Sequence, residues 1–259
     1  MVIPVHDRNP TRRTPVVTWT LIAINVVVFL LSPVARVPGT ATTTQDLCSQ
    51  QAFFLHWGAV PTELVHNDQL PYTVGKAVDP THCLRVTPRY HKIPALSALT
   101  NIFVHGGWLH LLGNMLFLMI FGNNVEDRFG RVLYLLFYLA VGMAATYGFA
   151  LTGPNSQQTL VGASGAIAGV LGAYLVLFPR AKVVSLVPFL LFLPVRLPAW
   201  IVLAFWFVLQ AAYAGGAGVG DGGVAYLVHV VGFVLGVLAG LLARSIASKK
   251  LARSGEPHG

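Results

Sequence analysis

Charged residues are scarce in this chain of 259 residues. Asp, Glu, Lys and Arg together make up 10% of the sequence, whereas an ordinary soluble domain contains about 25%. Hydrophobic residues make up 55%, and a soluble fold of this length could not hide so much apolar surface. The composition therefore excludes an ordinary soluble domain and indicates a membrane protein.

Acidic residues are the scarcer of the two charged kinds. There are 9 of them against 17 Lys and Arg, which gives a formal net charge of +8. A basic excess is typical of nucleic-acid binding, but it is also typical of membrane proteins that carry anchoring charges on their cytoplasmic side. The positions of the charges along the chain distinguish these alternatives.

Low-complexity stretches, internal repeats and a cleavable signal are also missing. The first apolar run, Val16–Leu31, lacks a small-residue cleavage site and is interpreted as a retained membrane span. Further apolar runs follow it, separated by polar or proline-containing stretches. The expected spans are Val16–Leu31, Phe103–Asn123, Val132–Leu151, Leu160–Phe178, Ala199–Tyr213 and Val224–Ser245.

These runs predict an all-α membrane protein built as a bundle of six transmembrane helices over residues 16–245. Residues 1–15 form the expected cytoplasmic N-terminus, and residues 246–259 form a cytoplasmic basic tail. A long extracytoplasmic loop, about residues 32–95, separates the first two spans. With six spans, both termini lie on the same side of the membrane.

The basic residues identify that side. Twelve of the Lys and Arg residues fall in the termini and in the connections on the terminal side, together with four acidic residues, so this side carries the whole excess of +8. The opposite side is neutral. Because short cytoplasmic loops are enriched in Lys and Arg, both termini are predicted to be cytoplasmic, in a plasma membrane whose inner leaflet presents anionic lipids. Because the basic residues are concentrated on the side expected to face the cytoplasm, they give no support for nucleic-acid binding.

Cysteine is nearly absent, and both cysteines, Cys48 and Cys83, lie in the expected outer loop. Two cysteines in one extracytoplasmic loop favour a disulfide. Zinc is the alternative, because four histidines share the loop, but their spacing matches no zinc pattern, and no metal is predicted. These histidines are His56, His66, His82 and His91.

Polar side chains within apolar spans are costly and usually mark function, and four of them share one position relative to the membrane. His110 and Asn114 lie in the second span, Ser164 at the start of the fourth and His229 in the sixth. The second, fourth and sixth spans all begin at the outer face, and each of these residues lies within the first turns of its span. The four groups are therefore predicted to meet at one depth, just below the outer surface.

The residue types predict a hydrolytic centre. Ser164 is a nucleophile if a neutral histidine takes its proton, and His229 is available as that base. His110 and Asn114 are four residues apart on one helix face, and both can donate hydrogen bonds to an oxyanion, as can the Ser164 backbone N–H. The alternative is purely structural: a packing hydroxyl at Ser164 and an interhelical hydrogen bond at His229.

Small residues provide for a close approach of the fourth and sixth spans. One ridge on each span has small residues at four-residue spacing, which lets helix backbones approach in lipid. The two ridges are Ser164, Ala168 and Gly172 in the fourth span, and Gly232, Gly236 and Gly240 in the sixth. This contact would bring His229 towards Ser164.

The chain resembles rhomboid intramembrane serine proteases over about Phe103–Gly240. The resemblance rests on four segments that together are highly specific: His105-Gly-Gly-Trp-Leu-His110-Leu-Leu-Gly-Asn114, Gly122-Asn-Asn-Val-Glu126-Asp-Arg128-Phe-Gly130, Gly162-Ala-Ser164-Gly165 and His229-Val-Val-Gly232-Phe-Val-Leu-Gly236. Two positions differ from some family members: Leu96-Ser97 stands in place of Trp-Arg, and Ala168 in place of a tyrosine that stacks on the base.

The resemblance implies a six-helix rhomboid fold and cleavage of other proteins' transmembrane segments near the outer face, without a cofactor. It implies that Ser164 is the nucleophile and His229 the base, that His110 and Asn114 support the oxyanion together with Gly162, and that His105 belongs to the supporting network. A proteolytically silent rhomboid-like protein that binds transmembrane clients is the alternative. A small transporter is disfavoured because its polar groups would lie near mid-membrane.

Overall fold

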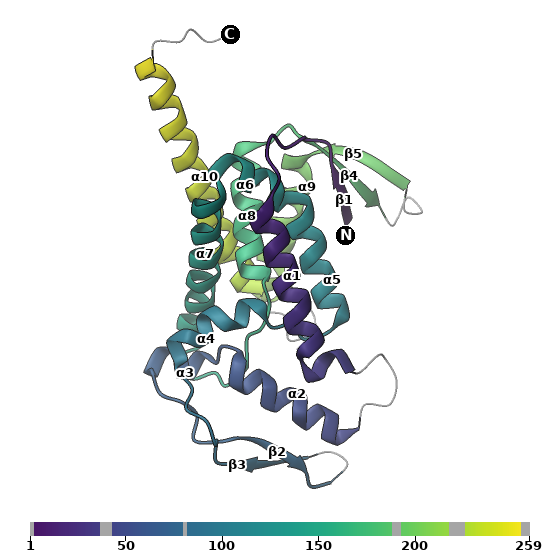
Figure 1. Ribbon diagram of the computed structural model, residues 1–259, viewed down its shortest axis with the longest axis vertical. Coiled ribbons are helices and arrows are strands. Elements are labelled where there is room, and N and C mark those ends of the chain that lie inside the picture. The colour runs from purple at the N-terminus through teal and green to yellow at the C-terminus, as the bar shows by residue number, and fades with distance from the viewer. Residues whose placement is uncertain (1–2, 37–42, 80–81, 188–192, 218–225, 255–259) are drawn as a thin grey trace.

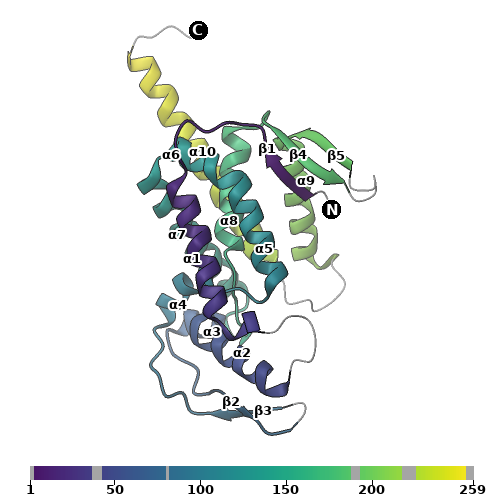
Figure 2. The same ribbon diagram turned by 45° about the vertical axis from the view of Figure 1, so that its right-hand side comes forward.

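The chain folds into a mostly helical structure in which six apolar helices run along the long axis of the molecule (Figures 1 and 2). The computed structural model describes residues 3–36, 43–79, 82–187, 193–217 and 226–254. The six apolar segments are α1 (Val16–Leu31), the continuous run α5–η3–α6 (Trp108–Phe117, Leu118–Gly122 and Asn123–Phe129), α7 (Arg131–Thr152), α8 (Ser164–Leu177), α9 (Ala199–Ala212) and α10 (Tyr226–Ser254).

Three helices are long and apolar enough to cross a membrane, judged by length and composition: Trp108–Phe129, Arg131–Thr152 and Tyr226–Ser248. Val16–Leu31, Ser164–Leu177 and Ala199–Gly215 are shorter apolar helices. The chain is therefore a helical protein with membrane-spanning segments, while the count of six spans stays a prediction.

The helix boundaries refine the predicted spans at functionally relevant points. The predicted first span coincides with α1, and the predicted fourth span begins four residues too early, because α8 starts at Ser164 itself. The second helical run begins at Trp108, so His105 lies in the segment before it rather than within a helix. The last helix continues to Ser254, past the expected boundary at residue 245. The segment before this helix, residues 218–225, which includes the start of the expected sixth span, and the end of the tail, residues 255–259, lie outside the described residues.

The described residues also form five short strands, so the expectation of a purely helical fold is wrong. β1 (Ile3–Asp7) pairs antiparallel with β4 (Lys182–Val187), which pairs antiparallel with β5 (Leu193–Pro198). Asp7 extends this contact into the bundle, because its carboxylate accepts hydrogen bonds from Tyr174 Oη at 2.6 Å and Asn124 Nδ2 at 2.7 Å. Burial raises the pKa of the Asp7 carboxyl, and the Tyr174 hydrogen bond opposes that rise.

The first helix takes its N-terminal cap from a distant part of the chain. Pro15 at the N-cap position makes no side-chain hydrogen bond. Buried Glu126 instead accepts hydrogen bonds from the backbone N–H groups of Val17 at 2.9 Å and Thr18 at 2.7 Å, and from the Thr18 hydroxyl at 2.7 Å. A carboxylate at a helix N-terminus accepts hydrogen bonds from the free N–H groups and interacts favourably with the positive end of the helix dipole. Glu126 therefore fixes α1 against α6.

Glycines bring the backbones of α8 and α10 into direct contact. A Cβ atom on Gly232 would overlap the carbonyl oxygen of Gly165, and one on Gly236 would overlap the carbonyl oxygen of Gly169. The predicted ridge of α10 is therefore correct at these positions. On α8 the prediction is correct at Gly172, where an added Cβ atom would overlap the carbonyl oxygen of Phe233. It is wrong at the other two positions, because Gly165 and Gly169, rather than Ser164 and Ala168, face the glycines of α10. This rotation leaves the Ser164 hydroxyl beside the contact rather than inside it.

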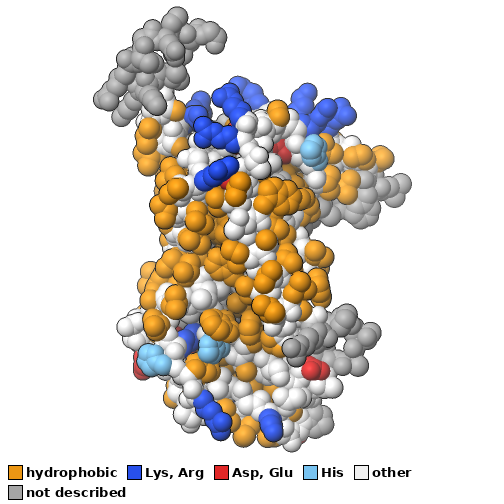
Figure 3. Space-filling view, in the orientation of Figure 1, with side chains coloured by type: hydrophobic (Ala, Val, Ile, Leu, Met, Phe, Trp, Pro, Cys, Tyr) orange, Lys and Arg blue, Asp and Glu red, His pale blue; other side chains and the backbone are white. Residues whose placement is uncertain are grey.

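Lys and Arg side chains gather at one end of the molecule, beyond a broad hydrophobic belt (Figure 3). This end carries β1, β4 and β5, whereas the long loop between α1 and α5 forms the opposite end (Figure 1). The asymmetry is the one expected of a membrane protein with a basic cytoplasmic side.

The loop between α1 and α5 has its own small fold. It contains helices α2 (Thr44–Trp57), α3 (Pro61–His66) and α4 (Pro94–Thr100), and a hairpin of β2 (Thr73–Ala77) with β3 (Cys83–Val86). A disulfide between Cys48 and Cys83 joins α2 to β3, 35 residues further along the chain. Cys48 is completely buried in a small core with Leu55, Val60 and other apolar side chains.

Loss of this disulfide is expected to destabilise the outer loop. Closing a loop of this length contributes about 3–4 kcal/mol in the chain-entropy model. Cys83→Ser should therefore lower the denaturant concentration at which the loop becomes sensitive to protease, whereas Ser49→Ala, at an exposed serine beside Cys48, should not. Free alkylation of both thiols in the unreduced wild type would contradict the expectation.

Candidate active site

Ser164 and His229 come together from two different helices. Ser164 is the first residue of α8, and His229 lies in the first turn of α10. His229 Nε2 lies 2.8 Å from Ser164 Oγ, within hydrogen-bonding distance. The geometry is that of a hydroxyl nucleophile beside a base that can take its proton.

The segment before Ser164 passes close to His110. Gly162 has φ +129°, a backbone conformation that favours glycine. A Cβ atom on Gly162 would lie 2.7 Å from His110 Nε2 and 3.6 Å from Ser164 Oγ. Only a glycine therefore fits between the serine and the His110 ring, and the structure brings together three of the predicted site residues at this point.

Asn114 lies one turn after His110 on α5 and is buried. Its Nδ2 group has no hydrogen-bond partner among the described residues. A buried amide donor without a partner is costly, and it is a suitable donor for a negative charge that develops only during a reaction.

His105 is buried behind His110. The two rings meet edge to face, with their centroids 5.2 Å apart, and neither ring nitrogen of His105 has a hydrogen-bond partner within the described part of the chain. Its contact is with the His110 ring, so the geometry is that of a packing support for His110.

Two backbone contacts fix the segment that leads to Ser164. The Gly162 N–H donates to the carbonyl oxygen of Asn101 at 2.9 Å. Ala59 and Leu160 exchange two backbone hydrogen bonds, of 3.0 and 2.7 Å. The outer loop is therefore joined directly to the strand-like segment that ends at the serine. The role of Asn101 was not predicted.

A buried ion pair holds the outer-loop side of that contact. Lys92 Nζ lies 2.6 Å from Glu63 Oε2 and donates to the carbonyl oxygens of Leu55 at 2.7 Å and Gly58 at 2.8 Å. Burial lowers the pKa of the Lys92 ammonium group, and the hydrogen bond to Glu63 opposes that shift. The ammonium group thereby caps the end of α2, immediately before Ala59.

One polar residue at the site was not predicted. Gln210, buried on α9, places its Oε1 atom 2.6 Å from His229 Nδ1, so the imidazole has a polar partner on each ring nitrogen. The sequence carries a signal for this residue, because Gln210 is the only amide in the apolar run Ala199–Tyr213.

Aromatic rings also surround His229. The Trp206 ring centroid lies 6.0 Å from that of His229, and the Tyr226 centroid lies 6.3 Å away with its ring nearly perpendicular. Ala168, one turn after the serine, has no aromatic ring. The aromatic neighbours of the base therefore come from α9 and α10 rather than from α8.

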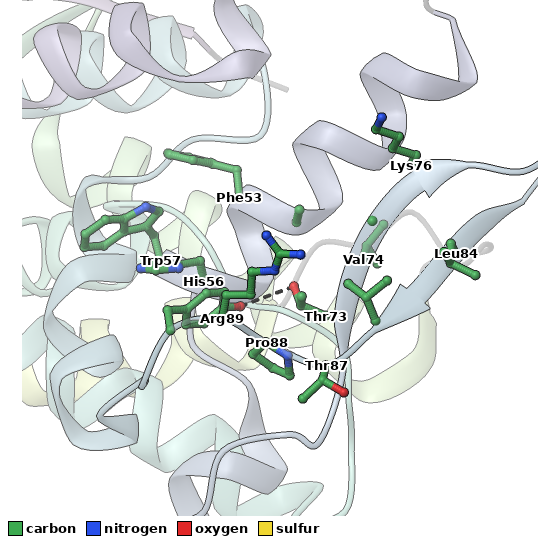
Figure 4. A pocket seen from close by; sticks show the side chains of 14 residues that line it. Phe53, His56, Trp57, Thr73, Val74, Lys76, Leu84, Thr87, Pro88 and Arg89 are labelled. Carbon is green, nitrogen blue, oxygen red and sulfur yellow. Dashed lines mark hydrogen bonds between the residues drawn. The ribbon is translucent and has the colours of Figure 1, made fainter.

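The outer loop also contains a hollow, separate from Ser164. It has a volume of about 950 Å³ and lies between α2 and the β2–β3 hairpin, with Phe53, Trp57 and Arg89 among its lining side chains (Figure 4). None of the residues that line it is one of the predicted site residues. Among the described residues, no group of three or more His, Cys, Asp or Glu side chains is placed to hold a metal ion.

This chain is similar to known proteins over the part that contains these residues. The family model of the Rhomboid domain matches residues 95–246. RHOMBOID-like protein 5 of Arabidopsis thaliana is 40% identical over 77 residues, which cover 30% of this chain and 25% of the relative. Rhomboid protein 1, mitochondrial, of Saccharomyces cerevisiae is 30% identical over 164 residues, or 61% of this chain and 44% of the relative.

A bacterial relative carries the word protease in its name. Rhomboid protease GluP of Bacillus subtilis is 42% identical over 77 residues, which cover 30% of this chain and 15% of the relative. The chain thus spans less than half the length of each of these relatives. The family model covers more than half of the chain, however, and includes all of α8, with Ser164, and most of α10, with His229. The chain belongs to the rhomboid family.

Proposed function

We propose that this protein is an intramembrane serine endopeptidase that hydrolyses peptide bonds in or near the transmembrane segments of other membrane proteins. The observation that carries the proposal is the 2.8 Å distance between Ser164 Oγ and His229 Nε2, made between two helices whose backbones are in contact. Membership of a family that includes proteins named as proteases supports it.

In the proposed reaction, Ser164 Oγ attacks the carbonyl carbon of the scissile bond while His229 Nε2 accepts the hydroxyl proton. The resulting imidazolium gives that proton to the leaving amine, and the C–N bond breaks. Water then attacks the acyl-enzyme carbonyl carbon while His229 accepts one of its protons. The imidazolium returns that proton to Ser164 Oγ as the ester C–O bond breaks, which releases the new carboxyl group and regenerates the serine hydroxyl. No cofactor takes part in these steps.

The oxyanion of each tetrahedral intermediate needs hydrogen-bond donors. His110, Asn114 and the backbone N–H of Ser164 are the proposed donors, with Gly162 leaving room for them and His105 packing behind His110. The unpartnered Asn114 amide group supports this role. The serine N–H at the start of α8 also places the positive end of the helix dipole at the oxyanion.

Asn114→Ala is expected to reduce kcat by about 10²-fold, the loss typical of removing one oxyanion donor, with a smaller effect on KM. Steady-state kinetics on a transmembrane substrate would measure both constants. Asn25→Ala is a matched control, because Asn25 is a buried asparagine in α1 that donates to the Leu21 carbonyl oxygen. An unchanged kcat for Asn114→Ala would remove Asn114 from the oxyanion role.

The proposed topology places the site near the outer face. The basic end of the molecule (Figure 3), which carries β1 and β4 (Figure 1), would lie in the cytoplasm against anionic lipids of a plasma membrane. Ser164 would lie towards the opposite surface, because it begins α8 and the other end of α8 leads to β4. Water would reach the site from outside, since hydrolysis requires it and the lipid interior does not supply it. The substrates are therefore membrane proteins that present a helix end at that surface.

The test is a cleavage assay in liposomes. The purified chain is mixed with a single-span protein carrying tags on both sides of the membrane, and the product termini are mapped by mass spectrometry. The proposal predicts cuts in or just outside the span, near its extracytoplasmic end. If the protein binds the span and never cuts it, the proposal fails in favour of a silent, client-binding rhomboid.

A further inference from the structure

We propose that Gln210 is a positioning residue that holds His229 in the tautomer needed to activate Ser164. The inference rests on the proposed function and extends the site from a pair of residues to a chain of three. It begins from two distances at the same imidazole ring: 2.8 Å from Nε2 to Ser164 Oγ, and 2.6 Å from Nδ1 to Gln210 Oε1.

The chemistry of the amide oxygen fixes the proton. A carbonyl oxygen accepts and cannot donate, so a hydrogen bond to Gln210 Oε1 requires the proton of neutral His229 to be on Nδ1. Nε2 then carries the lone pair and faces the serine hydroxyl, which is the protonation state that a general base needs. With the proton on Nε2 instead, the same ring could not accept the proton of Ser164.

An amide suits this location better than a carboxylate. Gln210 is buried on α9, in an apolar helix, where an ionised side chain would cost more than a neutral one. An amide oxygen serves as the third group in the Cys-His-Asn arrangement of some cysteine proteases. A Ser-His-amide chain therefore supplies orientation without placing a charge in the bundle.

A second residue on the same face of α9 contacts the His229 ring. Trp206 lies one turn before Gln210, so both side chains project from one side of the helix. The Trp206 and His229 ring centroids are 6.0 Å apart, and the Trp206 ring also lies 6.0 Å from Phe233 of α10. The Trp206 ring packs against the His229 imidazole, and Gln210 binds its Nδ1 atom. Together they define the orientation of the imidazole, a role that Ala168 cannot fill because it has no aromatic ring.

Two substitutions separate positioning from mere packing. Gln210→Leu keeps a similar shape and removes the acceptor, whereas Gln210→Glu keeps an acceptor oxygen at the same place and, when ionised, cannot donate. Gln210→Leu is expected to reduce kcat by about 10- to 100-fold with little change in KM, because Nδ1–H is left unpaired in a buried site. Gln210→Glu should restore most of the rate. Val208→Ala, at an outward-facing position of α9, is the control.

The pH dependence of kcat/KM gives a readout that a structural role would not change. The groups that face His229 are Ser164 from α8, Trp206 and Gln210 from α9, and Tyr226 from its own helix. His110 on α5 is a further titratable group close enough to interact with it. A carboxylate in place of Gln210 favours protonated His229, which cannot act as a base. Activity of Gln210→Glu should therefore be lost at a higher pH than in the wild type as the pH falls.

The outcomes are distinct. Equal kcat values for wild type and Gln210→Leu, or a Gln210→Glu variant as slow as Gln210→Leu with an unshifted profile, would overturn the positioning role while leaving the protease intact. If Gln210→Leu does not fold, the profile of Gln210→Glu decides alone: a shift to higher pH supports the role, and an unshifted profile overturns it. A wild-type protein that cleaves nothing would instead overturn the proposed function.

Discussion

Replacing His229 by alanine is expected to reduce the rate of substrate cleavage by about 10⁴-fold or more, as removal of the base does in serine proteases. The expectation follows from the 2.8 Å contact with Ser164 Oγ, since the hydroxyl is a weak nucleophile without a base. Ser164→Ala should have an effect of similar size. The measurement is the initial rate of product formation at equal amounts of folded protein in liposomes.

The double variant gives a sharper result than either single one. Residues that act as one unit are not additive, so Ser164→Ala combined with His229→Ala should be no slower than each alone. His91→Ala, which removes an exposed histidine of the outer loop, is the matched control and should keep the wild-type rate. Rates of His229→Ala within tenfold of the wild type would exclude His229 as the base.

Gly236→Ala is expected to disrupt both stability and activity. The added Cβ atom would lie 2.6 Å from the Gly169 carbonyl carbon and 2.7 Å from its Cα atom. These are backbone atoms that cannot rotate away, so α8 and α10 must separate. Overpacking of this kind costs about 1–3 kcal/mol and sometimes more. His229 lies two turns before Gly236, and the separation would also draw it away from Ser164.

A glycine in open space provides the control. Nothing lies within 4 Å of a Cβ atom built on Gly113 of α5, so Gly113→Ala should be as stable as the wild type or slightly more so, given the higher helix propensity of alanine. Thermal unfolding in detergent and the cleavage rate would be measured for both variants. Equal unfolding temperatures and rates for Gly236→Ala and Gly113→Ala would show that the close helix contact is not required.

The convergence of the site was predictable because it depends on helix direction and charge distribution. Placing His110, Ser164 and His229 near the outer ends of three spans was enough to predict the Ser164–His229 pair. The pairing of Cys48 with Cys83 followed from there being only two cysteines. Both inferences need only the residue types and the side of the membrane on which each span begins, and not how the helices pack.

Features that depend on long-range contacts could not be predicted in the same way. The pairing of β1 with β4 joins residues 3–7 to residues 183–186, and nothing in either short segment specifies the other. Which small residues of α8 face α10 depends on a rotation of the helix that four-residue spacing leaves open. Gln210 has an apolar span around it, and its role depends on where α9 packs. The sequence showed an isolated polar group there without showing its partner.

The most direct measurement of the central claim is covalent labelling of the intact protein with an organofluorophosphonate, which reacts with activated serine hydroxyls. A single adduct is expected on the wild-type chain, mapped to Ser164 by peptide mass spectrometry, and none on Ser164→Ala. In His229→Ala the adduct should form far more slowly. Absence of an adduct on wild-type protein that cleaves its substrate, or equal labelling of His229→Ala, would contradict activation of Ser164 by His229.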